Sequence, residues 1–408
     1  MIHPDEAVAL MASFIREPET ETAELSGALG RVMPSAALGG LDQPPFDKAA
    51  MDGWAWCPSG DEARPAEPLA IRGVIAAGSG SIDGDRPDEP LGPGEAARIM
   101  TGAPLPRGAS RIQRFEWAET VDEAGRPAAD GRFVRFAKAE GADNVIRRGE
   151  NARSGDEILS PRVLSAQDVA ILAADGRAAV RVARRPVVGV LSTGAELADP
   201  GEALSGARIY DSNRPQILAQ LASPAFEARD LGRLPDDLDA TLAAVRSALD
   251  ACDVLVLSGG VSMGDFDYVP RALAAAGVVE RFHGVAMKPG KPTYFGTTGR
   301  SFVLGLPGNP VSVFVNTELL VKTLLYALSG VAYRPLVAPV VAAEAIARRG
   351  SDRVEFLPVA VGPDGARAVR YGGSSGIQAL AFADGFARLE IGQERIEKGT
   401  ITRVRLVR

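Results

Sequence analysis

Three continuous apolar runs stand out in the middle of the chain, at residues 186–191, 253–257 and 301–306. Runs of this kind are typical of strands buried on both faces of a parallel sheet. Segments with helical spacing separate or follow them, at 214–222, 237–250, 266–276 and 311–328. This alternation predicts right-handed βαβ units in a doubly wound sheet, and so an α/β fold for this part of the chain.

The regions on either side of the predicted sheet have a different pattern. Residues 4–16 present one apolar face at helical spacing and predict a helix. Between residues 40 and 140, Pro, Gly and Asp interrupt short strand-like runs, which predicts a β-rich region whose strand order the pattern does not give. Residues 335–408 again hold short strand-like runs and little helix, so we expect a small β domain there.

The composition excludes several classes of site. The 408 residues carry 45 Lys and Arg against 52 Asp and Glu, a net charge of −7 that argues against a nucleic-acid-binding surface. Two cysteines, Cys57 and Cys252, and two histidines, His3 and His283, are too few for a disulfide framework or a Cys/His metal cluster. No wholly apolar run approaches ~18 residues and the first residues lack a secretory h-region, so we expect no membrane helix and a cytoplasmic protein.

Glycine-rich turns follow the three apolar runs, at residues 192–194, 258–262 and 306–310. Ligands of open parallel sheets bind beyond the carboxyl ends of the strands, where free N–H groups and helix N-termini favour phosphate or another oxyanion. A single turn of this kind is more often purely structural. Three at equivalent strand ends favour an anion site.

Charged residues around these turns suggest what the anion would meet. Glu196 projects from the first strand end, and Asp236 follows a strand expected at 228–231, so both can reach one side of the same crevice. Carboxylates next to an anionic ligand need a divalent cation such as Mg²⁺. Lys288 and Lys291 place two cations on a stiff Pro/Gly loop, for which the alternative is an ordinary solvated loop.

Two other enzyme classes fit the sequence poorly. Residues 260–264 match the G-x-S-x-G nucleophile elbow, but His283 is the only histidine that follows it and it lies just one βα unit later. No G-x-G-x-x-G opens a helix in the predicted sheet, as a dehydrogenase would require.

Eight motifs identify a family. They are PFDKAAMDGWA (45–55), RIMTGAP (98–104), RRGE (147–150), STGAE (192–196), IYDSNR (209–214), SGGVSMG with Asp267 and Tyr268 (258–268), KPGKP (288–292) and GLPGNPVS (305–312). With these motifs in this order, the chain resembles the MoeA family of molybdopterin molybdenumtransferases. That family is related to the E domain of gephyrin. Each motif alone is weak, but the eight together run through nearly the whole chain.

The resemblance implies a multidomain α/β protein: an elongated N-terminal domain from residues 1–45 and 140–182, a β-rich insert at 46–139, a MogA-like α/β domain at 183–330 and a C-terminal β barrel at 331–408. It also implies that molybdate is inserted into adenylylated molybdopterin, with Mg²⁺-dependent release of AMP. The resemblance further implies an elongated homodimer in which the insert of one subunit faces the sheet domain of the other. Other proteins of the cofactor pathway are further candidate partners.

The resemblance carries over site residues where the motifs match. The catalytic set it implies is Asp52, Thr101, Glu196, Asp267, Lys288 and Lys291, and the Mg²⁺ ligands are Glu196 and Asp236. The substrate-binding set it implies is Arg147, Arg148, Thr193, Ser258, Gly259, Gly260, Ser262, Pro307, Gly308, Asn309 and Pro310.

The sequence departs from the family pattern at Trp54, at Lys48 and Ala49, and along residues 111–116. None of these departures removes a charged site residue, so an active enzyme is favoured over a weakened paralogue. The alternatives are a MogA-like molybdopterin adenylyltransferase, against which the additional N- and C-terminal regions argue, and a non-catalytic molybdopterin-binding scaffold. The sequence does not distinguish molybdate from tungstate.

Overall fold

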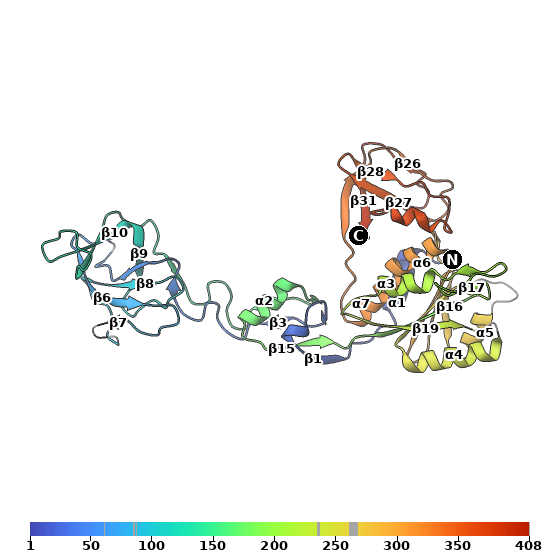
Figure 1. The fold of residues 1–408 in the computed structure, drawn as a ribbon, viewed down its shortest axis with the longest axis horizontal. Coiled ribbons are helices and arrows are strands. Elements are labelled where there is room, and N and C mark those ends of the chain that lie inside the picture. The colour runs from blue at the N-terminus through green and yellow to red at the C-terminus, as the bar shows by residue number, and fades with distance from the viewer. Residues whose placement is uncertain (61, 85, 87, 235–236, 261–267, 408) are drawn as a thin grey trace. The chain divides into compact units, whose positions relative to one another are not determined.

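The computed structural model describes residues 1–60, 62–84, 86, 88–234, 237–260 and 268–407, and its ribbon is drawn in Figure 1. The chain divides into two compact units. Unit 1 comprises residues 1–35, 161–170 and 178–408, and unit 2 comprises residues 36–160 and 171–177. The division into four domains remains a prediction.

A six-stranded sheet forms the centre of unit 1, in the order β19-β16-β20-β24-β23-β21. The first four strands, β19 (Glu227–Leu234), β16 (Val187–Thr193), β20 (Val254–Ser258) and β24 (Phe302–Leu306), are parallel. The last two strands are β23 (Tyr294–Thr297), which is antiparallel to β24, and β21 (Val279–His283), which is antiparallel to β23. The predicted doubly wound parallel sheet is therefore confirmed, and strand order reverses between β16 and β20, where such sheets bind ligands.

Helices cover both faces of this sheet, as Figure 1 shows. The helices α3 (Asn213–Gln220), α6 (Pro310–Asn316) and α7 (Lys322–Leu328) pack on one face, and α4 (Leu238–Ala251) and α5 (Tyr268–Ala275) pack on the other. Alternate residues of β20 explain why its sequence is apolar throughout. Val254 and Val256 join the first hydrophobic core, while Leu255 and Leu257 join the second.

The last helical segment of the sheet domain runs unbroken from Pro310 to Leu328, because a π-helical turn at Thr317–Val321 joins α6 to α7. Its 19 residues are long and apolar enough to cross a membrane by length and composition alone. However, 61% of its apolar window is buried inside the protein, and it contributes Val313, Leu320 and Leu324 to the core of unit 1. It is therefore a core helix of the sheet domain.

The N-terminal segment begins with α1 (Pro4–Ala12), which is shorter than the predicted helix at 4–16. His3 and Glu6 form a capping box at its start. Strand β1 (Thr20–Glu24) then pairs with β15 (Ala179–Ala183), and β2 (Val32–Met33) pairs with β14 (Arg162–Val163). The helix α2 spans Ala166–Ala174.

The C-terminal region is β-rich, as expected. Its main sheet has the order β22-β27-β29-β31-β25, formed by β22 (Met287–Lys288), β27 (Val354–Gly362), β29 (Gly385–Leu389), β31 (Ile401–Leu406) and β25 (Val337–Val341). Strand β28 (Gly365–Ala368) pairs with β27, and β26 (Ile346–Ala347) pairs with β30 (Arg395–Ile396). Because β22 belongs to this sheet, the lysine-bearing loop that follows it is attached to the C-terminal strands.

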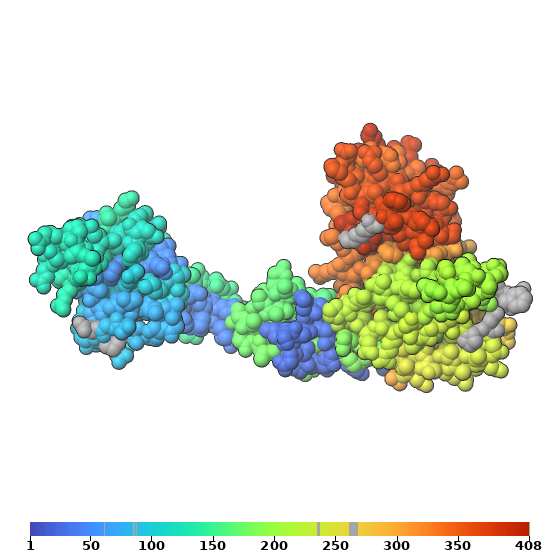
Figure 2. All heavy atoms as spheres, viewed as in Figure 1, coloured from blue at the N-terminus to red at the C-terminus, as the bar shows by residue number. Residues whose placement is uncertain are grey.

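Unit 2 is built around a seven-stranded sheet with the order β10-β11-β6-β8-β5-β9 and a short β7 (Asp83–Gly84) beside β6. The strands are β10 (Ala118–Val121), β11 (Phe133–Phe136), β6 (Leu69–Ile75), β8 (Glu95–Ile99), β5 (Gly53–Trp56) and β9 (Arg111–Arg114). Small paired strands complete the unit, namely β3 (Ala37–Leu38) with β13 (Glu157–Leu159) and β4 (Lys48–Ala49) with β12 (Val145–Ile146). In the space-filling view, the strands of the seven-stranded sheet belong to the lobe coloured blue to teal (Figure 2).

Candidate functional site

The three predicted turns meet at the switch point of the sheet. The N–H of Gly259 donates to the carbonyl of Leu306 at 3.0 Å, which joins the turns after β20 and β24. A Cβ at Gly260 would lie 2.6 Å from Thr193 Oγ1, so the turn after β16 leaves no room for a side chain there. Gly259 and Gly260 also have positive φ values, +85° and +64°. These glycines therefore serve both the turn geometry and the close approach of neighbouring strand ends.

Asn213 connects two of these turns, although the sequence analysis did not select it. Its side-chain amide donates to Ser258 Oγ at 2.9 Å and to the carbonyl of Gly308 at 2.7 Å. The Oδ1 atom of Asn213 is buried, and no donor among the described residues bonds to it. The amide thus holds the second and third turns in one arrangement and leaves an acceptor at their junction.

A buried arginine fixes the start of helix α3, which carries Asn213. Arg214 bonds Asp211 at 3.1 Å and Asp230 at 2.6 Å, and it also pairs with Asp199. Asp211 additionally accepts the N–H groups of Asn213 and Arg214, two donors of the first turn of α3 that have no partner within the helix. Burial raises the pKa of Asp230, but the hydrogen bonds from Arg214 and Gly232 outweigh it, so the net pKa is lowered.

Glu196 is exposed just beyond the end of β16. Its carboxylate folds back over the preceding turn. This is seen at Gly194, whose φ is +140°, where a Cβ would lie 2.6 Å from Glu196 Oε2. Among the described residues, nothing donates a hydrogen bond to this carboxylate or pairs with it. An exposed carboxylate of this kind fits Mg²⁺, which prefers one or two carboxylates together with substrate phosphates and water.

The other predicted members of this cluster cannot be placed. Asp236, Ser262 and Asp267 lie outside the described residues, as does most of the G-x-S-x-G motif. Within the described part of the chain, no three acidic, His or Cys side chains gather into a metal-sized group. His283 lies on β21, separated from β20 by two strands, and its ring packs edge-on against Tyr294.

The loop that carries Lys288 and Lys291 is firmly anchored. Lys288 Nζ lies 3.0 Å from a carboxylate oxygen of Glu355, a buried residue of β27. A Cβ at Gly290 would lie 2.3 Å from Asn316 Nδ2 of helix α6, and Thr293 Oγ1 donates to Gly290 O at 2.6 Å. Lys291 is exposed and has no carboxylate partner among the described residues. The loop is therefore anchored, with one lysine paired and the other without a carboxylate partner in the part of the chain that the structure describes.

The turn after β24 is held by the C-terminal region. Asn309 Nδ2 donates to Ser374 Oγ at 2.7 Å, and the N–H of Val311 donates to the carbonyl of Ser374 at 3.0 Å. Pro307 is buried, and Pro310 is the first residue of α6. Sequence reasoning missed both Ser374 and Glu355 as supports of the site. The one signal for Glu355 was a carboxylate in an otherwise apolar strand.

In unit 2, the fold brings together Asp52 and Thr101, which are 49 positions apart. Asp52 Oδ1 accepts from the N–H of Thr101 at 2.7 Å and from its hydroxyl at 2.6 Å. These two hydrogen bonds lower the pKa of Asp52, so the exposed carboxylate stays ionised at neutral pH. The pair lies between the end of β8 and the start of β5.

Arg147 and Arg148, also in unit 2, are engaged with carboxylates of their own unit. Arg147 lies 3.1 Å from Asp47 and also pairs with Asp143. The N–H of Arg148 donates to Asp47 at 2.8 Å, and its guanidinium lies 2.7 Å from Asp42. An anionic substrate at this point would have to compete with these acids.

Comparison with known proteins covers nearly the whole chain. Residues 2–176 match the model of the MoeA N-terminal region (domain I and II), residues 189–327 match a probable molybdopterin binding domain, and residues 340–407 match the MoeA C-terminal region (domain IV). The molybdopterin molybdenumtransferase of Bacillus subtilis is 33% identical over 325 residues, which is 79% of this chain and 73% of the relative. That of Haemophilus influenzae is 34% identical over 333 residues, or 81% and 78% of the two chains.

The solved structures agree with these matches. The molybdopterin biosynthesis moeA protein from Pyrococcus horikoshii OT3 aligns over 100% of both chains, with a TM-score of 0.83 and 26% identity. A further crystal structure of a molybdopterin biosynthesis moea protein from Pyrococcus horikoshii gives a TM-score of 0.80 at 29% identity, covering 100% of this chain and 99% of the other. The chain therefore belongs to the MoeA family of molybdopterin molybdenumtransferases, transferases of molybdenum cofactor biosynthesis.

Proposed function

We propose that this protein inserts molybdate into adenylylated molybdopterin and releases AMP. The observation that carries this proposal is the convergence of three glycine turns at the switch point, two of which are tied together by Asn213, with the exposed carboxylate of Glu196 beside the first turn. The anchored loop with Lys288 and Lys291 packs on α6, the helix that starts at the third turn. Family membership supplies the substrate class.

The chemistry suits these residues. Molybdate and pyrophosphate are both anions, and Lys291 and the N–H groups of the turns would neutralise them before a phosphorus–oxygen bond breaks. Lys288, held by Glu355, would present its charge from a fixed position. The reaction needs no protein nucleophile, because an oxygen of molybdate or a water molecule can attack phosphorus.

We further propose Mg²⁺ as the cofactor, held by Glu196 and, by the family resemblance, Asp236. When bound, the ion would supply positive charge at the pyrophosphate. Glu196 is suited to this role because its carboxylate is exposed and unpaired within the described part of the chain. The family resemblance also gives Asp267, Ser262, Arg147 and Arg148 as site residues, and these assignments remain proposals.

The test of this function is direct. The purified protein is incubated with adenylylated molybdopterin, molybdate and Mg²⁺, and AMP release is followed. We expect AMP to form only when molybdate is present. A control with ATP and unadenylylated molybdopterin should form no adenylylated product. Product in that control, without molybdate-dependent AMP release, would instead indicate an adenylyltransferase.

We also propose a cytoplasmic homodimer in which the insert of one subunit completes the site of the other through Asp52 and Thr101. The support is that these two residues form an exposed, ionised pair in unit 2, while the turns and Glu196 belong to unit 1. The four-domain division, 1–45 with 140–182, 46–139, 183–330 and 331–408, follows from the same family resemblance.

Subunit exchange tests the shared site. Asp52→Ala and Glu196→Ala proteins should each be inactive, and mixing them should restore part of the AMP release, because a heterodimer contains one site with both native residues. The control is each variant exchanged with itself under the same conditions. Heterodimers that form but stay inactive would contradict a site shared between subunits.

A further inference from the structure

A row of amide side chains runs along one face of helix α3. Asn213, Gln216 and Gln220 are spaced i, i+3 and i+7, so they lie on the same side of the helix. That side faces the third glycine turn and helix α6, which packs with α3 in the first hydrophobic core (Figure 1). Helices packed together usually meet through apolar residues at this spacing, so three amides in one row call for an explanation.

Each amide of the row donates to a main-chain carbonyl of the facing segment. The bonds are Asn213 Nδ2 to Gly308 O at 2.7 Å, Gln216 Nε2 to Pro310 O at 3.2 Å, and Gln220 Nε2 to Phe314 O at 3.2 Å. A carbonyl oxygen only accepts hydrogen bonds, so each amide must turn its nitrogen toward this segment. Donors and acceptors follow one another in the same order along both segments, and we call this set of three bonds the amide ladder.

A buried carboxylate fixes the end of the amide ladder that lies away from the glycine turns. Glu318 is 6% exposed and belongs to the π-helical turn that follows α6. Its carboxylate accepts from Gln220 Nε2 at 3.1 Å and from the hydroxyl of Tyr333 at 3.1 Å, and it pairs with Lys322. Burial and the charge of Glu318 raise the pKa of Tyr333 to about 12, so the hydroxyl keeps the proton that it donates.

The amide ladder permits one axial register of α3 against α6. Each residue of a helix advances the chain by about 1.5 Å, whereas an N–H···O bond tolerates a few tenths of an ångström, so a slip by one residue would break all three bonds. Helix α3 begins at Asn213, which is bonded to the second and third turns, and α6 begins directly after the third turn. The register of the two helices therefore sets the spacing of these two turns.

We propose that Gln216 and Gln220 are positioning residues of the transferase site. They act through the register of α3 against α6, which places the N–H groups of the third turn relative to those of the second. A displacement of about 1 Å at a reacting group can lower a rate by ~10²-fold, so a fixed register has catalytic value. The catalytic role rests on the proposed function, whereas the placement of the turns rests only on the contacts described above.

The double variant Gln216→Met/Gln220→Met tests this role. Methionine is similar in length, unbranched and favourable in helices, but its side chain donates no hydrogen bond, so packing is kept and the ladder is lost. We expect kcat for molybdate-dependent AMP release to fall about ten-fold or more, with little change in KM. Adenylylated molybdopterin should still bind at one molecule per chain, and Tm should stay within ~5 °C of the wild type.

Hydrogen exchange gives a second readout that does not need activity. The N–H of Gly259 donates to the carbonyl of Leu306 and so reports the contact between the second and third turns. In the double variant we expect this amide, followed by mass spectrometry in a peptide covering residues 253–260, to exchange at least about three-fold faster. Exchange in helix α4, on the other face of the sheet, should be unchanged.

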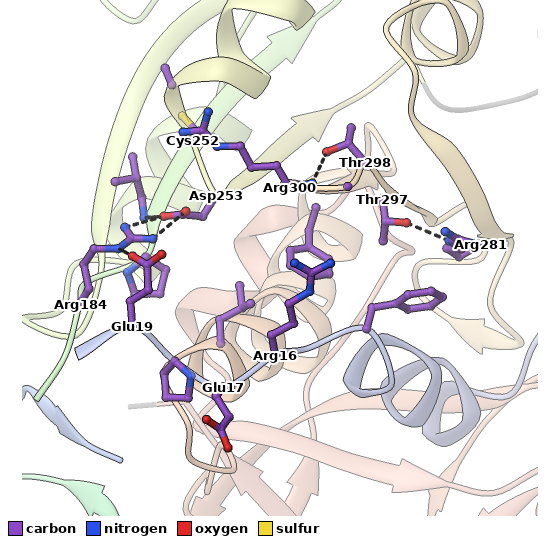
Figure 3. Close-up of a pocket in the computed structure, with 18 residues that line it drawn as sticks. Arg16, Glu17, Glu19, Arg184, Cys252, Asp253, Arg281, Thr297, Thr298 and Arg300 are labelled. Atoms are coloured by element: carbon purple, nitrogen blue, oxygen red, sulfur yellow. Dashed lines mark hydrogen bonds and ion pairs between the residues drawn. The ribbon is translucent and has the colours of Figure 1, made fainter. Parts of the chain in front are cut away.

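Thr297→Val is the matched control. Thr297 is buried, and its hydroxyl accepts from Arg281 Nε at 2.9 Å (Figure 3). It pairs with Phe302 at the beginning of β24, the opposite end of that strand from the third turn. This variant also loses a side-chain hydrogen bond, but it should keep the kcat of the wild type and the wild-type exchange of Gly259.

The outcomes separate this proposal from the proposed function. A double variant with the kcat of the wild type, or with unchanged exchange of Gly259, would overturn the positioning role. A loss of pterin binding and of Tm in step with kcat would also overturn it, because the ladder would then serve stability alone. Wild-type protein that releases no AMP would contradict the proposed function, whereas faster exchange of Gly259 in the double variant would still support the placement of the turns by the ladder.

Discussion

Replacing Glu196 by glutamine is expected to reduce molybdate-dependent AMP release by at least ~10²-fold, the scale seen when an electrostatic stabiliser is removed from an active site. The substitution keeps the size of the side chain and removes the charge that we propose as a Mg²⁺ ligand. The turns at Gly259 and Gly308 and the loop with Lys291 are untouched, so the variant should remain folded and still bind the adenylylated pterin. AMP release is measured across a Mg²⁺ titration, with pterin binding followed in parallel.

Glu202→Gln provides the matched control. Glu202 lies a few residues beyond Glu196 and pairs with Arg208 at 3.0 Å in the segment that connects β17 (Leu197–Ala198) to β18 (Ile209–Tyr210). The Glu202→Gln substitution removes the same charge, but Glu202 is not a residue of the proposed site. AMP release by this variant should therefore stay close to that of the wild type. If the Glu196 variant also keeps a near wild-type rate at low Mg²⁺, Glu196 is not a metal ligand.

The second large effect is on stability. Arg214→Met is expected to lower the free energy of unfolding by about 3 kcal/mol, the lower end of the range for breaking a buried ion pair. The loss comes mainly from Asp211, which is buried with 2% exposure and would be left without its cation. Asp199 and Asp230 are about half exposed and would regain water, so they add little. Urea unfolding followed by circular dichroism measures the difference.

The pH dependence gives this prediction a second readout. The pKa of Asp230 is lowered in the folded protein, so the stability contributed by its pairing with Arg214 is present above the unfolded pKa of ~3.9 and is lost as the pH falls through the lower folded value. The difference between wild type and Arg214→Met should therefore shrink in acid by the small share that Asp230 contributes.

Arg229→Met serves as control because Arg229 pairs with exposed Glu227 on the same strand, and it should change stability by no more than ~0.5 kcal/mol. An Arg214 variant as stable as this control would show that the network around Asp211 does not hold helix α3.

The parallel sheet could be predicted because the pattern that specifies each strand lies within the sequence of that strand. The runs at β16, β20 and β24 are apolar at every position, and a strand needs this only when both of its faces are covered. The glycines of the following turns were likewise recognisable, because a positive φ or a close strand approach excludes most other residues. These features predicted that the turns lie together at the carboxyl ends of the parallel strands, and the turns after β20 and β24 are indeed joined there.

The order of strands in unit 2 could not be predicted. Strand β5 lies between β8 and β9, and β6 runs parallel to β8 with a register shift, although all are short and separated by similar turns. Short strands with similar patterns can pair in many orders, since pairing energy depends on cross-strand packing that the sequence does not display.

The sequence by itself determined the doubly wound sheet and, through eight motifs, the family. Only the tertiary structure decided which charged groups are free. Lys288 is paired with Glu355, 67 positions later on the neighbouring strand of the same sheet, whereas Lys291 has no carboxylate partner among the described residues. Arg148 meets Asp42 across 106 positions. Ion pairing depends on distances of a few ångströms between residues remote in the chain, and no local pattern records such distances.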